Sequence, residues 1–208
     1  MKTQGVKSIS RSVIFQFIYI FVQGVVGIAI VPLIIKLIGK EQYGVLEIIL
    51  SLLIINLFLE FGLGSTIIKY LQEYKKRSTK LYNKFIWTYF YFKSFIALIA
   101  LIIVYIIGLY FDSIFNNIPK ENISIIRLSV KIFALGIVFL NISSLLTNIL
   151  KGLIRFDFAL VPGIISQIFA LLLIYSFHFL KIKPSIADIA YVLFLVRPLI
   201  VIIISIIF

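Results

Sequence analysis

Arg197 is the charged residue whose position in this sequence most needs an explanation. It directly precedes Pro198 and stands about ten residues from either end of an apolar run at 187–208. If that run crosses a membrane, an ionised side chain near its centre costs about 2.5 to 3.5 kcal/mol on insertion scales. A cation beside a proline break is suited to bind an anionic group such as a pyrophosphate, because exclusion of water strengthens charge-assisted hydrogen bonds. Two interpretations stay open, an anion site or a structural pair with Glu60 or Glu47.

The fourth apolar run carries polar side chains along one face. At 100° per residue, five of them share a broad sector of a helix: Arg127, Lys131, Asn141, Ser144 and Asn148. In lipid such a stripe would leave polar groups unsatisfied, so it should face the interior of a bundle or a wet cavity. We therefore expect Arg127, Lys131 and Asn141 to contribute to a substrate site with Arg197.

The first two apolar runs add neutral amides and one acid. Gln16 and Gln23 lie in a row at helical spacing, and Asn56 and Glu60 form an i, i+4 pair. The amides either line the same cavity or form hydrogen bonds that only hold the bundle together. Glu60 is a candidate for ion coupling, and Lys93 is expected to be an interfacial lysine.

Composition identifies the elements that must position these residues. The 208 residues are 62% hydrophobic and 13% charged, with a mean hydropathy of +1.16. That is more apolar surface than a soluble fold of this size buries. The runs are continuously apolar rather than alternating, which predicts helices and not a membrane barrel. The fold class is therefore an all-α integral membrane bundle.

Six transmembrane helices are expected in a single transmembrane domain over 1–208. Their predicted ranges are 13–37, 43–70, 85–111, 124–150, 159–180 and 187–208. With a cytoplasmic N-terminus, eleven basic residues lie on the cytoplasmic side, five on the other side and four within the spans. The positive-inside rule thus predicts a multi-pass protein of the cell membrane with its N-terminus in the cytoplasm. The apolar end of the sequence suggests that the chain is truncated at the C-terminus.

The sequence lacks the residues that several functional classes require. There is no cysteine and only one histidine, which excludes thiolate and paired-imidazole metal sites, and no cofactor is indicated. A phosphate-binding loop is absent, because Gly39-Lys40 lacks the preceding glycine that the motif needs. The formal net charge of +12 comes from basic residues that lie between or inside apolar runs, so it indicates topology rather than nucleic-acid binding. We expect no enzymatic activity.

Two segments carry a resemblance to a known family. The first runs from Val31-Pro32-Leu33 through Gly39-Lys40-Glu41-Gln42-Tyr43-Gly44, and the second is Glu60-Phe61-Gly62-Leu63-Gly64-Ser65 with Ile68-Lys69-Tyr70. Together they resemble the polysaccharide biosynthesis (Wzx-type) flippases of the multidrug/oligosaccharidyl-lipid/polysaccharide exporter superfamily. Lys151-Gly152-Leu153 to Arg155-Phe156 is also similar to a loop of that family.

The resemblance implies two six-helix lobes around a cationic cavity that opens to each side of the membrane in turn, and this chain would be one lobe, the N-terminal half. The passenger implied is a polyprenyl-pyrophosphate-linked oligosaccharide, flipped for surface polysaccharide biosynthesis while its tail stays among the membrane lipids. Glycosyltransferases or a polymerase of a glycan assembly pathway are the implied protein partners, and no nucleic acid is.

Three other readings stay open. One is a cation-coupled exporter of small molecules in the same superfamily, against which the intramembrane excess of basic over acidic residues argues. Another is a membrane-embedded glycan polymerase or acyltransferase, with His178 or Glu60 as acid or base. The third is a noncatalytic scaffold in a glycan assembly complex.

Overall fold

The computed structural model describes residues 2–60, 62–114, 123–153 and 156–207, leaving aside the side chains of 2–12, 112 and 156–157. Within those ranges the chain is helical almost throughout and contains no strand, which confirms the predicted all-α class. Six segments are long and apolar enough to cross a membrane: Val13–Ile38, Lys40–Glu60, Thr79–Leu109, Ile123–Gly152, Phe158–Phe179 and Ile186–Ile207. The chain is an α-helical membrane protein of the multi-pass type.

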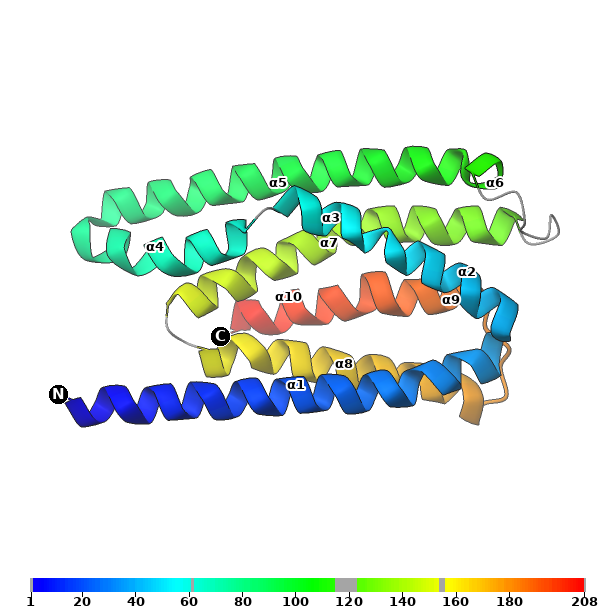
Figure 1. Cartoon of the computed structure of the whole chain (residues 1–208), viewed down its shortest axis with the longest axis horizontal. Coiled ribbons are helices and arrows are strands. Elements are labelled where there is room, and N and C mark those ends of the chain that lie inside the picture. The colour runs from blue at the N-terminus through cyan, green and yellow to red at the C-terminus, as the bar shows by residue number, and fades with distance from the viewer. Residues whose placement is uncertain (1, 61, 115–122, 154–155, 208) are drawn as a thin grey trace.

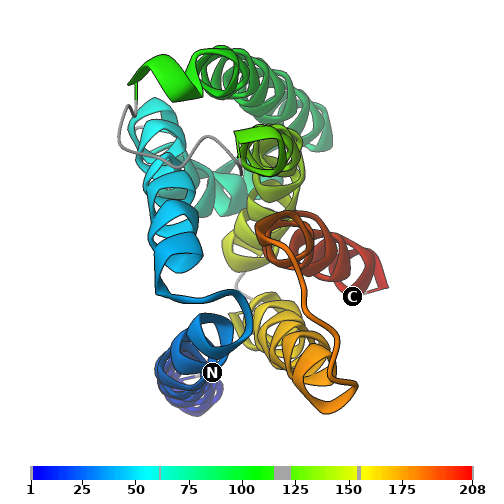
Figure 2. The same ribbon diagram turned by 90° about the vertical axis from the view of Figure 1, so that its right-hand side faces the viewer.

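The helices run side by side along the long axis of the molecule (Figure 1). In chain order they are α1 (Lys2–Ile38), α2 (Lys40–Ser51), α3 (Leu53–Glu60), α4 (Leu63–Arg77), α5 (Thr79–Leu109), α6 (Phe111–Ile114), α7 (Ile123–Gly152), α8 (Phe156–Phe179), α9 (Ile186–Tyr191), a π-helical turn η2 (Val192–Val196) and α10 (Arg197–Ile207). Figure 2 looks along the bundle and shows α7 at its centre, between α5 on one side and α10 and α8 on the other. α1 packs against α8 at the edge of the bundle.

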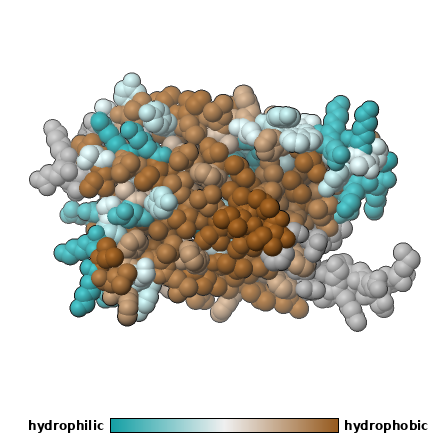
Figure 3. Space-filling view, turned by 180° about the vertical axis from the view of Figure 1, so that it is seen from behind, coloured by the Kyte–Doolittle hydropathy of each residue, from teal (hydrophilic) through white to brown (hydrophobic). Residues whose placement is uncertain are grey.

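Basic side chains mark one end of the bundle, which we call the basic end. α1 begins there, and the end also holds the last turn of α4, the first turns of α5 and the end of α7: Lys75, Lys76, Arg77, Lys80, Lys84 and Lys151. Between the two ends, the face of the molecule in Figure 3 is a broad apolar band, with hydrophilic side chains gathered toward the ends. This distribution is what a bilayer requires of a spanning bundle.

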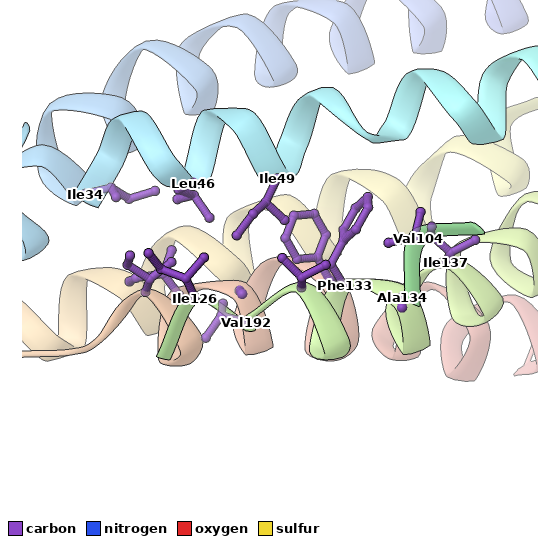
Figure 4. Packing of buried hydrophobic residues seen from close by; sticks show 14 of the residues in the cluster. Ile34, Leu46, Ile49, Val104, Ile126, Phe133, Ala134, Ile137 and Val192 are labelled. Atoms are coloured by element: carbon purple, nitrogen blue, oxygen red, sulfur yellow. The ribbon is translucent and has the colours of Figure 1, made fainter. Parts of the chain in front are cut away.

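The main core lies where α2, α7 and the α9–η2 segment meet. Ile49 and Phe133 are fully buried there, and Phe133 packs edge-on against Phe194 with ring centroids 4.6 Å apart. Figure 4 shows Ile34, Leu46 and Ile49 from one side of this core facing Ile126, Phe133 and Val192 from the other. The contact holds α7 against the segment that carries Arg197.

The prediction of one continuous helix over 43–70 is wrong. The structure divides the segment into α2, α3 and α4, with a break at Leu52 and another between α3 and α4. Gly62 has φ +72°, a left-handed conformation that glycine adopts at little cost and that ends a right-handed helix. Only Lys40–Glu60 is apolar enough to span, and α4 continues beyond it toward the basic end.

α1 begins at Lys2, eleven residues before the predicted start of the first span at 13. The other predicted spans agree with the structure to within a few residues, except that α5 begins six residues before the predicted start at 85. Ser78 explains this early start, because its Oγ accepts a hydrogen bond from the Lys80 backbone amide at 3.2 Å and caps the helix. The predicted end of the sixth span, at 208, lies outside the described residues.

The backbone before Arg197 departs from an α-helix because of Pro198. Proline has no N–H for the carbonyl four residues earlier, which is that of Phe194, and the preceding turn widens into the π-helical turn η2. Gly136 of α7 packs directly against this carbonyl, since a Cβ at position 136 would lie 2.6 Å from the Phe194 oxygen. The proline, the widened turn and the glycine together fix where Arg197 emerges between α7 and α8.

Candidate functional site

A polar hollow of about 310 Å³ lies between α1, α7, α8 and α10. Two of its lining residues are basic, Arg197 of α10 and Lys151 at the end of α7. Its other polar lining side chains are hydroxyls and one amide: Tyr19, Ser143, Ser144, Thr147, Asn148 and Ser166. No acidic residue is among the described residues that line it. We call this cavity the basic hollow.

A second hollow, of about 250 Å³, lies between α1, α2, α8 and η2. We call it the amide hollow after two of its polar lining residues, Gln23 and Gln167, and it is also lined by Tyr43, Glu47 and Arg197. Tyr43 donates a hydrogen bond to the Glu47 carboxylate. Because this hollow contains an acid and the described lining of the basic hollow contains none, the two present different chemistry to a ligand.

The two hollows follow one another along the bundle and meet at Arg197, which lines both. On α1 the basic hollow is lined at Tyr19 and the amide hollow from Gln23 to Ile34, farther from the basic end. At 1.5 Å per residue, the stretch of α1 from Tyr19 to Ile34 covers about 22 Å, most of a hydrocarbon core of about 30 Å. Arg197 therefore lies between two hollows that together extend along much of the bundle, and most of the residues that line the amide hollow are apolar.

The Arg197 guanidinium has no carboxylate within ion-pair distance among the residues that the structure describes. Glu47 lines the same hollow without pairing with it, and Glu60 pairs with a different cation. Of the two interpretations of Arg197, the structural pair with Glu60 or Glu47 is not found among the residues that the structure describes.

Lys93 of α5 pairs with Glu60 instead and is the most deeply buried charged side chain described, at 1% exposure. Its ammonium donates to the Glu60 carboxylate, to Asn141 Oδ1 at 3.3 Å and to Ser144 Oγ at 3.3 Å. An ammonium has three N–H donors, and here each has an acceptor. The cost of burying the charge is thus offset by one counter-charge and two neutral oxygens.

The amides around Lys93 are oriented by their own hydrogen bonds. Asn141 Nδ2 donates to Asn56 Oδ1 at 2.7 Å and to the Ile137 carbonyl at 2.9 Å, which leaves its Oδ1 facing Lys93. Asn56 Nδ2 in turn donates to Glu60 at 3.3 Å. We call Asn56, Glu60, Lys93, Asn141 and Ser144 the buried network. It ties α3, α5 and α7 together.

The buried network reaches the wall of the basic hollow through α7. Ser144, which accepts from Lys93, lines that hollow and also accepts from Asn148 Nδ2 at 3.3 Å. Asn148 lines the hollow too and is bonded to the Tyr89 hydroxyl at 3.2 Å. A ligand in the basic hollow would therefore touch side chains that are one hydrogen bond away from the ion pair.

The expectation that Lys93 is interfacial is wrong. α5 begins at Thr79, fourteen residues earlier, so that Lys93 lies near the middle of the helix, about 21 Å from its start. Sequence reasoning had counted Glu60 and Lys93 separately, and only the packing of α3 against α5 and α7 shows that they are partners.

The other predicted site residues divide into three groups. Arg197 and Gln23 line hollows, as described, and Asn141 and Glu60 belong to the buried network. Gln16 and Lys131 are exposed, Arg127 is half-buried toward the far end of α7, and none of these three lines either hollow. The prediction thus placed all of these residues in one site, whereas the structure distributes them along the bundle.

Comparison of the chain with protein-family models, with curated proteins and with solved structures returned no match. Its function must therefore be argued from the two hollows and the buried network. In chemical terms, the basic hollow offers two cations and the hydroxyls of Tyr19, Ser144 and Thr147, which suit phosphate oxygens, whereas Ser143 and Ser166 already donate to backbone carbonyls. The amide hollow offers carboxylate and amide oxygens as acceptors.

Lys151 is a functional candidate that sequence reasoning assigned to a loop. In the structure it belongs to the last turn of α7 and lines the basic hollow. Its spacing from Ser144, Thr147 and Asn148 at i−7, i−4 and i−3 is that of one helix face. Extending the polar face of the fourth run by one residue beyond 150 would have included it.

Proposed function

We propose that this chain is part of a carrier that moves polyprenyl-pyrophosphate-linked oligosaccharide across the cell membrane for surface polysaccharide biosynthesis. The observation that supports it best is the basic hollow, which places Arg197 and Lys151 among hydroxyl side chains with no acidic residue among its described lining. A pyrophosphate needs cations and hydrogen-bond donors in a dry site, and a bundle interior strengthens both interactions.

The arrangement of the hollows supports transport rather than simple binding. An anionic head group held at Arg197 has a hollow on either side of it along the bundle, since that residue lines both. The π-helical turn before it is a place where a helix can change register locally, and such turns are frequent at functional sites. The head group would cross by exchanging one hollow for the other at Arg197, while its lipid tail stays in the bilayer.

The resemblance to Wzx-type flippases is consistent with this function and supplies the expected setting. It implies a second six-helix lobe, a cell-membrane location and neighbouring enzymes of glycan assembly. Because the sequence has no phosphate-binding loop, energy would come from an ion gradient or from consumption of the passenger on one side.

The test is translocation in liposomes that contain the purified complete carrier, with the second lobe that the proposal requires. The probe is a fluorescent, short-chain polyprenyl pyrophosphate, and a membrane-impermeant reductant quenches the dye in the outer leaflet. Wild type should expose inner-leaflet probe to the quencher, and Arg197→Gln and Lys151→Gln should each slow this at least tenfold. Lys69→Gln, at an exposed position of α4 outside both hollows, should leave the rate unchanged.

Three outcomes would overturn the proposal. Wild-type liposomes that move no probe would argue against a carrier of this class. Efflux of a cationic dye without movement of the pyrophosphate would favour the small-molecule exporter. A glycan product that accumulates without a change of leaflet would favour a polymerase or acyltransferase.

A further inference from the structure

An apolar groove of about 180 Å³ runs along the contact between α5 and α7. Lys93, Ser94 and Asn141 are its polar lining residues, and the other described ones are apolar: Phe90, Ala97, Leu98, Val138, Ile142 and Leu145. Phe90, Leu98 and Ile142 are exposed, so the groove opens to the outside of the bundle. Both helices are spans of membrane length, and the surroundings at this depth are therefore hydrocarbon. We call this space the lipid-facing groove.

The two buried polar residues of the lipid-facing groove have no hydrogen bond to offer an anionic ligand. The ammonium of Lys93 already donates to three acceptors of the buried network. The amide of Asn141 donates to Asn56 and to the Ile137 carbonyl. A charged head group therefore gains nothing by entering the groove, whereas the chain of a lipid matches its apolar surface.

Toward the basic end, the face of α5 that lines the groove becomes aromatic and then basic. Six exposed residues at spacings of three and four share this face: Lys80, Lys84, Trp87, Tyr91, Ser94 and Leu98. The Trp87 ring packs against those of Phe90 and Tyr91, with centroids 5.8 Å and 6.0 Å apart. Tryptophan and tyrosine side chains favour the head-group level of a membrane. Two cations, an interfacial ring cluster and an apolar groove thus follow one another along the helix.

This order is the order of groups in an anionic phospholipid, which has a charged phosphate, an interfacial glycerol and apolar chains. Each basic residue near the surface of an anionic membrane attracts such a lipid by about fivefold. The groove adds little hydrophobic energy, since lipid tails are as apolar as its own side chains. A chain that lies in the groove keeps the phosphate beside Lys80 and Lys84, so that charge and shape act together.

We propose that this surface binds one anionic phospholipid of the bilayer, with its phosphate at Lys80 and Lys84 and an acyl chain in the lipid-facing groove. The glycerol lies beside Trp87 and Tyr91. Figure 2 shows α7 between α5 and α8, and the residues of α7 that line the groove differ from those that line the basic hollow. The phospholipid is therefore separate from the passenger, and the site does not depend on the proposed function.

The experiment uses the fluorescence of Trp87, which is the single tryptophan among the 208 residues. The complete protein is reconstituted in phosphatidylcholine vesicles with increasing fractions of phosphatidylglycerol brominated near the glycerol end of its chains. A second series contains brominated phosphatidylcholine, and Trp87→Phe supplies the background. Because bromine quenches a neighbouring tryptophan, the two series give the lipid preference at Trp87. Wild type should prefer phosphatidylglycerol at least fivefold, and a smaller preference would overturn the inference.

Two double variants test the lysines. Lys80→Gln with Lys84→Gln should reduce the preference to below twofold. Lys75→Gln with Lys76→Gln removes the same charge from exposed positions of α4 at the same end of the bundle, and it should keep at least half of the wild-type preference. An equal loss in both double variants would show that the basic end attracts anionic lipid only diffusely, and the inference would fail.

Ser94→Phe tests the groove, because a ring at this exposed position fills the space of the chain. It should lower the preference at least threefold although both lysines are present. Ile106→Phe is the matched control, since Ile106 is exposed on α5 outside the groove. If Ser94→Phe lowers the preference no more than Ile106→Phe does, the chain does not lie in the groove and the inference is wrong.

Competition separates the phospholipid from the passenger. Unlabelled phosphatidylglycerol should displace the brominated lipid at least as well as farnesyl pyrophosphate does. If farnesyl pyrophosphate is far more effective, the surface binds the passenger and the inference fails. Transport plays no part in these measurements, so a failure of the proposed function leaves their outcome standing.

Discussion

Gly136 on α7 and the Phe194 carbonyl on η2 approach so closely that a Cβ at position 136 would lie 2.6 Å from the carbonyl oxygen. This is the carbonyl that Pro198 leaves without its helical donor. A close approach of backbones at glycine is the usual way in which membrane helices pack tightly. The contact fixes the position of the turn that carries Arg197, and hence the place where the two hollows meet.

Gly136→Ala should therefore destabilise the protein by roughly 1 to 3 kcal/mol, because the backbone oxygen cannot move aside as a side chain could. Thermal unfolding in detergent measures the effect. Gly24→Ala is the control, since its Cβ would meet nothing within 4 Å, and helix propensity alone predicts equal or slightly higher stability. Equal midpoints for the two variants would contradict the close packing of α7 against η2.

Lys93→Met should cost up to about 3 to 5 kcal/mol, the range for a fully buried pair, because it leaves the Glu60 carboxylate, which is 22% exposed, without its counter-charge. Lys93→Met combined with Glu60→Gln should recover most of that loss, since it removes both charges together. Both changes are measured as unfolding free energies in detergent.

The exposed pair Arg77–Glu73 is the control for that experiment, with side chains 62% and 47% exposed. Arg77→Met should change stability by about 0.5 kcal/mol or less, since exposed i, i+4 pairs contribute little. A loss in Lys93→Met no larger than that in Arg77→Met would show that the buried pair does not stabilise the bundle.

Lys131→Gln distinguishes the sequence-based site from the structural one. The polar face of the fourth run groups Lys131 with Arg197, whereas the structure leaves its side chain exposed and outside both hollows. Translocation of the pyrophosphate probe should stay within twofold of wild type in this variant. A tenfold loss of the translocation rate, as expected for Arg197→Gln, would mean that the transport path extends beyond the two hollows.

The orientation predicted from charge can be tested directly, because the chain has no cysteine that would have to be replaced before a single cysteine is introduced. Lys80→Cys at the basic end and Lys183→Cys at the opposite end are both at exposed positions. An impermeant maleimide added to intact cells should label Lys183→Cys, and Lys80→Cys only after permeabilisation. The reverse pattern would place the N-terminus outside the cytoplasm.

The number and the approximate bounds of the spans could be predicted because insertion depends on a local sum of side-chain hydropathies. The break between α3 and α4 was missed for the same reason, since Gly62 hardly alters that sum although its φ of +72° ends the helix. The early start of α5 was missed as well, because a cap at Ser78 depends on one hydrogen bond rather than on hydropathy.

The candidate site could be predicted only in part. A deep cation next to a proline was visible in the sequence, and Arg197 lines both hollows. The partner of Lys93 was not visible, because Glu60 is 33 residues away and meets it only through the rotation of α3 and α5 against α7. The assignment of Gln23 and Gln167 to one hollow depends on the same rotations.

A bundle of six membrane-spanning helices with charges inside it follows from the amino-acid sequence alone, because hydropathy and charge act locally along each run. Which charges neutralise one another and which face a cavity depends on how the helices pack. The physical reason is that a buried charge is stabilised within a few ångströms, and the helices that supply those contacts are far apart in the chain.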